Sequence, residues 1–410
     1  MPKKILVIPS WYPTPQNELT GSFFREQAQL MEQQGFEVRM LLGVQEVVRP
    51  KTGLVPSIKK RVPFLSILFA DETVVGTTKA VLSTSVLLQE PVAYSFPVPL
   101  REGADDEEWY RVSTGLYADA YDQLVSTGWV PDIIHAQCCN AAGIFAHWLS
   151  GKYHLPFVIT EHQLFLLHTL SSFRQQLILD ALKHAKKVAA VSEHQKKCIL
   201  MHQPDCNPVV IWNLINDLKF PAQHSKAEHP FTVVTVTYPN PIKDHSTFLK
   251  AMQVLAASAV DVRFVIIGND SFHDLSAGNS DEFIKESKEL GIEKLGTFIP
   301  YVKRDAIAAT LSHCDVFVCS SIAETFGVAA REAMLCGLPV VTTACGGVED
   351  SITEHTGITV PVRDHQAIAD AVLSIKNNPA KYNAEVIRNF IRKQCGTEIF
   401  AAKMKAFYEL

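Results

Sequence analysis

The chain has 410 residues, of which 47% are hydrophobic and 20% are charged, and its formal net charge is -5. This length is more than one hydrophobic core normally organises, so we expect two domains. The composition holds no biased tract, which excludes a disordered or fibrous chain. The negative net charge provides no overall positive field that would attract the phosphate backbone of a nucleic acid, so we expect no nucleic-acid partner.

The chain shows no sign of a membrane-spanning or secreted protein. No run reaches the length of about 18 to 20 apolar residues that a bilayer requires. The first apolar run, residues 5–8, stops at Pro9 and is too short for a signal sequence. We therefore expect a cytoplasmic protein whose only membrane contact would be peripheral, at the inner face. The nine cysteines are scattered without a Cys-x-x-Cys pair, which predicts reduced, mostly buried thiols.

Short β-branched runs alternate with longer segments of helical periodicity, and this alternation is typical of parallel α/β layers. The pattern occurs twice along the chain. The predicted strands are 4–8, 37–42, 133–135, 157–160, 188–191 and 209–212 in the first half, and 232–237, 263–267, 295–299, 316–319, 340–342 and 358–360 in the second. Each half therefore resembles a doubly wound, Rossmann-like parallel sheet.

Two segments do not follow the alternation. Residues 219–230 are polar, contain Pro221 and lack apolar periodicity, as expected of an interdomain linker. We therefore predict an N-terminal domain over 1–220 and a C-terminal domain over 221–381. Residues 45–106 contain many prolines and a basic patch at 59–61, and we interpret them as an insertion. A solvated loop explains that patch more simply than a surface for a membrane or an acidic acceptor.

The stretch 315–347 carries the most chemical information, because it reads as strand, loop, helix and strand. A helix beginning near Phe326 would direct its free N–H groups and positive dipole end toward a diphosphate. Gly327 would leave room for close approach. Glu324 and Glu332 are eight residues apart, or about 12 Å along a continuous helix. One ligand could contact both carboxylates, which suit the hydroxyls of a sugar or a ribose.

Residues 324–341, ETFGVAAREAMLCGLPVV, resemble the E-x7-E signature of the retaining glycosyltransferases of family 4. The glycine pair at 346–347 resembles the pair that follows this signature in the family. The resemblance extends to PSWYP at 9–13 and GSFFREQA at 21–28, and also to segments at 131–137, 160–162, 191–192 and 210–213. It covers nearly the whole chain apart from the predicted insertion.

This resemblance implies a GT-B architecture, in which two Rossmann-like doubly wound parallel-sheet domains face each other across a cleft. The N-terminal domain would bind the acceptor and the C-terminal domain the donor, with the helices from about residue 382 crossing back to the first domain. The implied donor is a UDP- or GDP-sugar, and the implied acceptor is a saccharide or lipid-linked molecule of bacterial cell-surface polysaccharide or glycolipid synthesis. The reaction would retain the anomeric configuration and require no metal or other cofactor.

The same resemblance implies roles for individual residues. Glu324 would contact the transferred sugar, Lys243 the diphosphate and His162 the region of the anomeric carbon, and these three are the candidate catalytic residues. Donor binding would also involve Glu332 at the ribose, together with Gly21, Thr325, Phe326, Gly327 and Val328. Lys243 has independent support, because the start of a helix repels cations unless a ligand compensates them. His162 follows a strand, where a histidine is as readily a packed core residue as a ligand contact.

One departure from the family pattern leaves the activity open. Tyr238 stands where relatives usually carry an arginine, five residues before the lysine, and a phenol cannot replace a guanidinium. Leu214 and Gln137 also replace a glycine and a histidine of the pattern. Two alternatives therefore remain, a GT-B nucleotide-sugar epimerase and a non-catalytic GT-B binding subunit. A nicotinamide dehydrogenase is disfavoured, because no Gly-x-Gly-x-x-Gly follows the first strand.

Overall fold

The computed structural model describes residues 2–13, 21–48, 83–84, 91–220, 230–258, 261–268, 281–300 and 304–409. The chain forms two compact units, of which the first comprises Met1–Tyr12, Met31–Thr160 and Leu166–Lys187. The second comprises Pro13–Leu30, Glu161–Phe165 and Val188–Leu410. The predicted boundary at residue 220 lies inside this second unit, and the crossing back of the helices from about residue 382 stays a prediction.

An eight-stranded sheet has the order β3-β4-β2-β1-β5-β6-β7-β8. Its strands are β1 (Lys4–Pro9), β2 (Glu37–Val48), β3 (Ser83–Thr84), β4 (Val92–Arg101), β5 (Ile133–Gln137), β6 (Phe157–Glu161), β7 (Lys187–Ala190) and β8 (Val209–Val210). β1 pairs in parallel with β2 on one side and β5 on the other, whereas β3 is antiparallel to β4. The chain thus winds outward in both directions from its first strand, as predicted.

The interpretation of residues 45–106 as an insertion is wrong in part. β2 continues to Val48, and β4 pairs with it in parallel from Val92 to Arg101. Among the described residues, β3 pairs only with Tyr94 and Ser95. The prolines of β4 lie beyond this pairing, on the outer strand side where proline is tolerated. The basic patch at 59–61 and most of the predicted linker lie outside the described residues.

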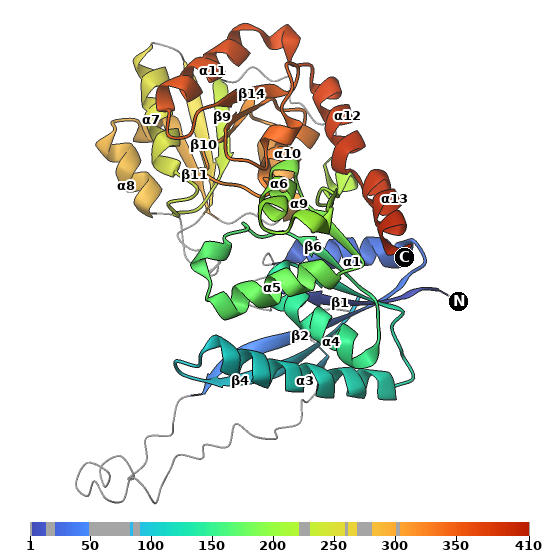
Figure 1. Ribbon diagram of the computed structural model, residues 1–410. Helices are drawn as coiled ribbons and strands as arrows, with labels where there is room; N and C mark the ends of the chain where they lie inside the picture. Colours follow the sequence, from blue (N-terminus) through green and yellow to red (C-terminus); the bar gives the residue numbers. More distant parts are fainter. Residues whose placement is uncertain are drawn as a thin grey trace, which may run out of the picture. The chain divides into compact units, whose positions relative to one another are not determined.

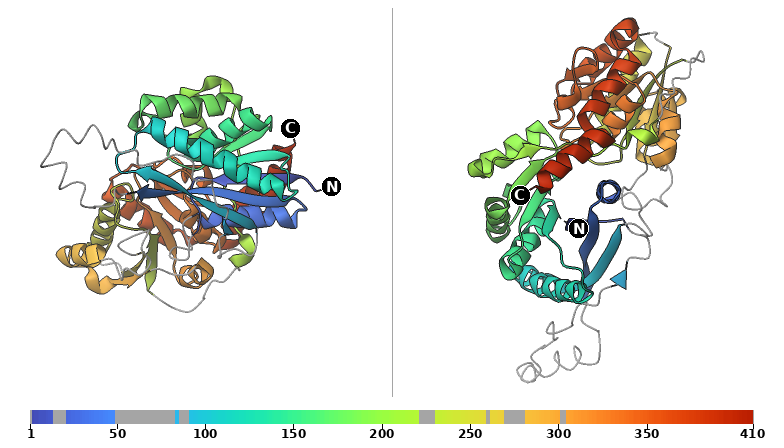
Figure 2. Two further views of the ribbon diagram at one scale, coloured as in Figure 1. Left: turned by 90° about the horizontal axis from the view of Figure 1, so that it is seen from below. Right: turned by 90° about the vertical axis from the view of Figure 1, so that its right-hand side faces the viewer.

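The helices of this half of the chain are α1 (Ser22–Gln33), α3 (Asp106–Ser126), α4 (Ile144–Tyr153), α5 (Ser172–His184) and α6 (Glu193–His202), with a π-helical turn at Cys139–Gly143. α3 begins where it does because the side chain of Asp105 accepts a hydrogen bond from the Glu108 amide. Three acidic residues in its first turn stabilise the helix, because their negative charges lie at the positive end of the helix dipole. α3 and α4 lie against one face of the sheet (Figure 2).

The second sheet lies wholly in the second unit and has the order β11-β10-β9-β12-β13-β14. Its strands are β9 (Phe231–Val236), β10 (Val262–Ile267), β11 (Gly296–Ile299), β12 (Val316–Cys319), β13 (Val340–Thr343) and β14 (Gly357–Val360). The helices are α7 (His245–Ala257), α8 (Asp281–Glu289), α9 (Arg304–Leu311), α10 (Val328–Leu335), α11 (His365–Asn377), α12 (Ala384–Cys395) and α13 (Thr397–Tyr408). The sheet lies between α7 and α8 on one side and α10 and α12 on the other (Figure 1).

This arrangement confirms the predicted fold class of two parallel-sheet α/β domains. Every residue of β12 and β13 is buried, because helices cover both faces of the sheet.

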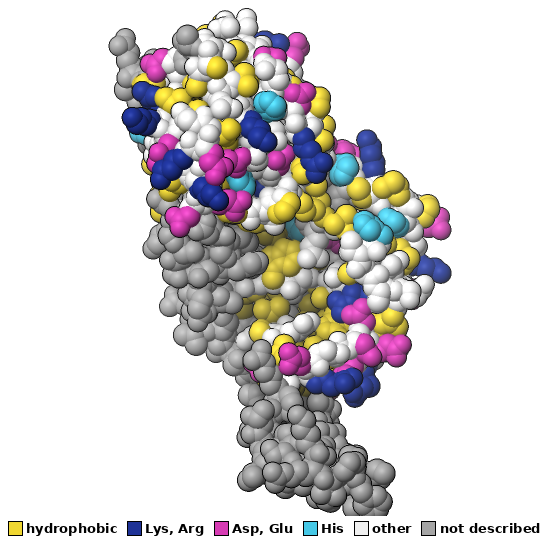
Figure 3. All heavy atoms as spheres, turned by 90° about the vertical axis from the view of Figure 1, so that its left-hand side faces the viewer, with side chains coloured by type: hydrophobic (Ala, Val, Ile, Leu, Met, Phe, Trp, Pro, Cys, Tyr) yellow, Lys and Arg dark blue, Asp and Glu magenta, His cyan; other side chains and the backbone are white. Residues whose placement is uncertain are grey.

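The short 3-10 helices are Leu167–Thr169, Pro204–Cys206, Asp217–Lys219, Glu293–Leu295, Glu349–Ser351 and Pro379–Lys381. No helix within the described ranges is long and apolar enough to cross a membrane. On the face in Figure 3, the basic side chains lie interspersed with acidic ones.

His135 on β5 makes the stability of the first sheet depend on pH. Its imidazole is buried and its Nε2 lies 2.8 Å from the Thr160 hydroxyl. Burial lowers the pKa of His135 to about 3, so the folded chain holds it neutral. The unfolded chain binds a proton there below about pH 6.5. The stability from this residue is thus complete above pH 6.5 and is lost as the pH falls toward 3.

We expect the His135→Gln variant to lose less stability on acidification than the parent chain. The parent should lose up to about 1.4 kcal/mol of unfolding free energy per pH unit below about pH 6.5 through this group. Urea unfolding between pH 7 and pH 5 measures this slope for each protein. His168→Gln, which changes an exposed imidazole, is the control and should keep the parent's slope. Equal slopes for the parent and His135→Gln would contradict the account.

Candidate active site

Two loops of the second unit meet at the carboxyl end of the six-stranded sheet. One follows β9 and carries Lys243, and the other follows β12 and carries Glu324. The strands are neighbours because the strand order reverses at β9, and the two loops are joined by a hydrogen bond from the Ile322 amide to the Ile242 carbonyl (2.7 Å). In doubly wound sheets this reversal point is where ligands bind.

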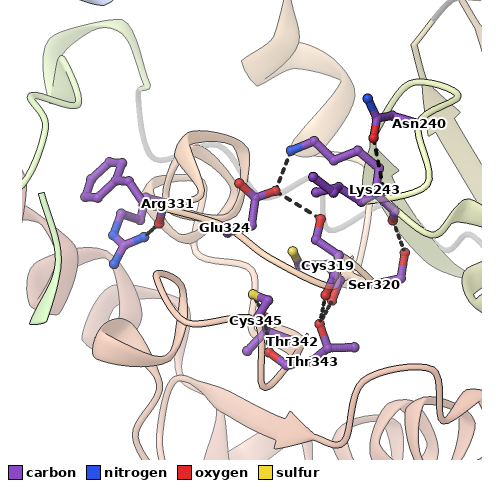
Figure 4. A network of polar contacts seen from close by, with 12 residues as sticks. Asn240, Lys243, Cys319, Ser320, Glu324, Arg331, Thr342, Thr343 and Cys345 are labelled. Atoms are coloured by element: carbon purple, nitrogen blue, oxygen red, sulfur yellow. Dashed lines mark hydrogen bonds and ion pairs between the residues drawn. The ribbon is translucent and has the colours of Figure 1, made fainter. Parts of the chain in front are cut away.

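Lys243 and Glu324 form an ion pair, with Nζ 2.5 Å from Oε1 (Figure 4). The Ser321 hydroxyl donates to the same carboxylate oxygen at 3.0 Å. Burial alone would lower the pKa of Lys243, but the charge of Glu324 and its hydrogen bond raise that pKa above its usual value. The structure therefore brings together two of the three predicted catalytic residues and holds the lysine as a cation.

The backbone around Lys243 is fixed by its own loop. The Lys243 amide donates to the Asn240 carbonyl at 2.9 Å, and the Ser320 hydroxyl donates to the Lys243 carbonyl at 3.1 Å. Asp244 adopts a left-handed conformation with φ +45° and caps α7. The ring of Tyr238 lies 5.6 Å from the ammonium nitrogen of Lys243, within the range of a cation–π contact. Tyr238 thus supplies a neutral aromatic wall beside the lysine.

The helix of the signature begins at Val328, two residues later than predicted from Phe326. Gly327 precedes it in a left-handed conformation with φ +77°, and a Cβ there would lie 2.4 Å from Val348 Cγ2. A glycine provides no side chain to cap the first N–H groups of α10. The ring of Phe326 is buried in the core, so this residue offers a ligand its backbone, whereas Thr325 and Val328 are half-buried.

The predicted glycine pair closes over the loop that carries Glu324. The Glu324 amide donates to the Cys345 carbonyl at 2.9 Å, and Gly346 has φ +105°. A Cβ on Gly347 would lie 2.3 Å from the Thr325 carbonyl oxygen. The two backbones therefore touch, and only glycine allows this contact.

Sequence reasoning missed Arg331, which lies on α10 and is completely buried. Its guanidinium donates to the Phe326 carbonyl and, at 3.0 Å, to the Gly347 carbonyl. It also lies 4.0 Å from the centroid of the Phe326 ring. The sequence feature that could have pointed to Arg331 is its position in the predicted helix, after two alanines and directly before Glu332, a predicted ligand contact. Arg331 ties the start of α10 to the glycine pair.

The remaining predicted residues take different places. Glu332 lies on α10 and is only 4% exposed, whereas a glutamate without a structural or binding role normally lies on the solvent-exposed side of its helix. His162 is also buried, with ring centroids 5.3 Å from Phe23 and 5.0 Å from Phe24. Gly21 has φ +72°, and its carbonyl accepts a hydrogen bond from the Phe24 amide. The roles of His162 and Gly21 toward a donor stay predictions.

We expect Gly327→Ala to lower the unfolding free energy by about 2 kcal/mol or more, because it combines a strained φ with a clash at Val348. Gly115→Ala is the matched control, since a Cβ there meets nothing within 4 Å and alanine suits a helix interior better by about 0.5–1 kcal/mol. Chemical denaturation of both variants measures the difference. A Gly327→Ala variant as stable as the parent would refute this reading of the turn.

Two protein-family models match adjoining parts of the chain. The model "Glycosyl transferases group 1" matches residues 216–393, and the model "Glycosyltransferase Family 4" matches residues 110–217. The first of these ranges contains Lys243, Glu324 and Glu332. Together the two models cover the chain from α3 to α12.

Curated relatives resemble parts of the chain. The D-inositol 3-phosphate glycosyltransferase of Mycobacterium sp. (strain KMS) is 34% identical over 125 residues, which are 30% of this chain and 28% of that protein. The protein of the same name from Mycobacterium leprae (strain Br4923) is 26% identical over 271 residues, or 59% of each chain. The chain thus spans less than two thirds of the length of these relatives.

Among solved structures, Anabaena Alr3699/HepE in complex with UDP superposes with a TM-score of 0.72 and 16% identity, over 98% of this chain and 99% of that one. The same protein in complex with UDP-glucose gives a TM-score of 0.69 and 15% identity, over 99% and 100% of the two chains. At such identity the likeness shows the fold. That fold is GT-B, and the two family models place residues 110–393 of the chain among the glycosyltransferases of family 4.

Proposed function

We propose that the chain is a retaining glycosyltransferase that moves a hexosyl group from a UDP- or GDP-sugar to a hydroxyl acceptor. One observation carries this proposal: Lys243 and Glu324 are paired at the carboxyl ends of β9 and β12. Beside Glu324, α10 begins without a side-chain cap. A cation, a carboxylate and free helix amides are the groups that a diphosphate and a sugar need.

The chemistry follows from how charge moves in the reaction. The bond from the anomeric carbon to the donor phosphate breaks, and its electron pair leaves with the diphosphate. Lys243 and the first amides of α10 stabilise that negative charge. The acceptor oxygen bonds to the same face of the sugar, and its proton passes to a diphosphate oxygen. The products are the glycoside and a nucleoside diphosphate, and no protein nucleophile takes part.

The ion pair holds the site ready for the donor. Lys243 and Glu324 neutralise each other while the site holds no ligand, so neither charge is left uncompensated. A bound diphosphate takes the lysine as its own counterion. The Glu324 oxygens then accept hydrogen bonds from sugar hydroxyls, while Ser321 keeps the carboxylate in place.

The comparisons suggest which ligands to test first. A neighbour of the same fold was solved with UDP and with UDP-glucose, which supports a UDP-sugar as the first donor. The relatives named for D-inositol 3-phosphate support a hydroxyl acceptor. We further propose a cytoplasmic enzyme, in contact with the inner membrane face at most, that makes bacterial cell-surface polysaccharide or glycolipid. Lys243 and the helix amides supply the positive charge, so the proposed reaction needs no metal cofactor.

Replacing Glu324 by glutamine or Lys243 by methionine should lower the transfer rate by about 100-fold to 1,000-fold, the usual cost of one electrostatic contact to the transition state. The measurement is release of the nucleoside diphosphate and formation of glycoside with a panel of donors and acceptors. Lys288→Met breaks the exposed ion pair with Glu293 in the same unit and is the matched control. Parental rates in Glu324→Gln would refute the site.

The same assay separates the two alternatives. An epimerase converts the donor into a second sugar without any acceptor, whereas a transferase produces glycoside only when an acceptor is present. A non-catalytic subunit binds the nucleotide but consumes no donor. Either result would replace the proposed function while leaving the nucleotide site in place.

Glu332→Gln should act on nucleotide affinity. The buried carboxylate on α10 would contact the ribose in the ground state and the transition state alike, so its loss removes uniform binding. We expect the Kd for UDP to rise about tenfold, the effect of losing one charged hydrogen bond of about 1.4 kcal/mol. Calorimetric titration measures Kd, and steady-state kinetics should show KM rising with kcat nearly constant. A fall in kcat at constant KM would overturn the ribose assignment.

A further inference from the structure

Arg331 places a full positive charge where no water reaches it. Its side chain is 0% exposed, and the partners found for it in the described part of the chain are the carbonyls of Phe326 and Gly347 and an aromatic ring. Its Nε makes no hydrogen bond to any of the described residues. Burial lowers the pKa of Arg331 to about 10, so the guanidinium remains charged at neutral pH. An unpaired buried cation is costly, and packing alone does not explain it.

The contacts of Arg331 direct this charge toward the candidate donor site. The Phe326 carbonyl shares its peptide unit with the Gly327 amide, and the Gly347 carbonyl shares its unit with the Val348 amide. A cation bound at a carbonyl polarises the peptide unit and strengthens the amide at its other end as a donor. One of these units leads directly into α10, and the other belongs to the glycine pair that touches Thr325.

The two cations beside Glu324 are held in different ways. Lys243 forms an ion pair with Glu324, and the ring of Tyr238 lies beside Lys243. Arg331 has no ion pair among the described residues, and Asp350 and Glu324 act on it only through their longer-range charge. In Figure 4, Lys243 and Arg331 lie on opposite sides of Glu324. A dianionic group bound at the start of α10 would meet Lys243 directly and Arg331 through two peptide units.

We propose that Arg331 is a positioning residue for a nucleoside diphosphate. Its guanidinium supplies positive charge to the start of α10 through the Phe326 and Gly347 carbonyls. This inference rests on the proposed function and extends it to a residue that does not touch the ligand. It also offers a second positive charge at a site where Tyr238 provides none.

A neighbouring arginine provides a matched control. Arg388 donates to the Leu335 carbonyl at 2.5 Å, at the opposite end of α10. It is partly exposed and makes the same kind of bond, from a guanidinium to a backbone carbonyl of the helix. A role limited to anchoring α10 would make the two arginines equivalent, whereas the proposed role concerns Arg331 alone.

The experiment compares Arg331→Met, Arg331→Lys and Arg388→Met in the full chain. UDP affinity is measured by calorimetry, and uridine affinity, which reports the nucleoside contacts without the diphosphate, by ligand-observed NMR. Arg331→Met should weaken UDP by about threefold to tenfold, because two amides lose part of their strength as donors, and should leave uridine unchanged. Arg331→Lys, which keeps the charge, should restore most of the affinity for UDP. Arg388→Met should bind both ligands as the parent does.

Equal losses for UDP and uridine in Arg331→Met, or no loss for either, would overturn the inference and leave the proposed function intact. A parent chain that binds neither UDP nor GDP would overturn both. If circular dichroism shows that Arg331→Met is unfolded, Arg331→Gln takes its place. A glutamine variant that binds UDP as well as the lysine variant does would then count against the charge. If Arg331→Met, Arg331→Lys and Arg331→Gln all unfold, Arg331 serves the fold alone, and the inference is rejected.

Discussion

The parallel pairing of β9 with β12 determines where this chain can carry out chemistry. It joins segments far apart in the sequence, because Val233 pairs with Val316 and Val234 with Phe317. The loops that leave these strands therefore emerge side by side, and the ion pair of Lys243 and Glu324 follows from their proximity. The signature helix, the glycine pair and the buried arginine are all arranged around the second of these loops. A change in the strand order would separate the lysine from the carboxylate.

The site also concentrates features that a purely structural region would avoid. Gly327 and Gly346 adopt positive φ, and added side chains there would meet Val348 and His194. Arg331 is charged, buried and bonded only to neutral partners among those described. Such features cost stability, and they persist where the surrounding core fixes them and a ligand benefits. The extensive burial of β12, β13 and the core helices provides that support.

Much of this organisation could be predicted from the sequence. The strands were predictable because central parallel strands are buried on both faces and read as short β-branched runs. The E-x7-E segment indicated Glu324, Glu332 and the glycine turn by resemblance. β4 could not be predicted, since its prolines oppose strand formation and lie beyond the two residues of β4 that pair with β3 in the described part of the chain. Arg331 was missed because periodicity cannot distinguish a solvated arginine from a buried one, and only the contacts with Phe326 and Gly347 reveal it.

The central claim is that a nucleoside diphosphate binds at the start of α10 against Lys243. A crystal structure of the chain with UDP tests it most directly. The account predicts phosphate oxygens within hydrogen-bonding distance of Lys243 Nζ and the first amides of α10, with the ribose at Glu332. UDP bound elsewhere, with Lys243 still paired to Glu324, would contradict it.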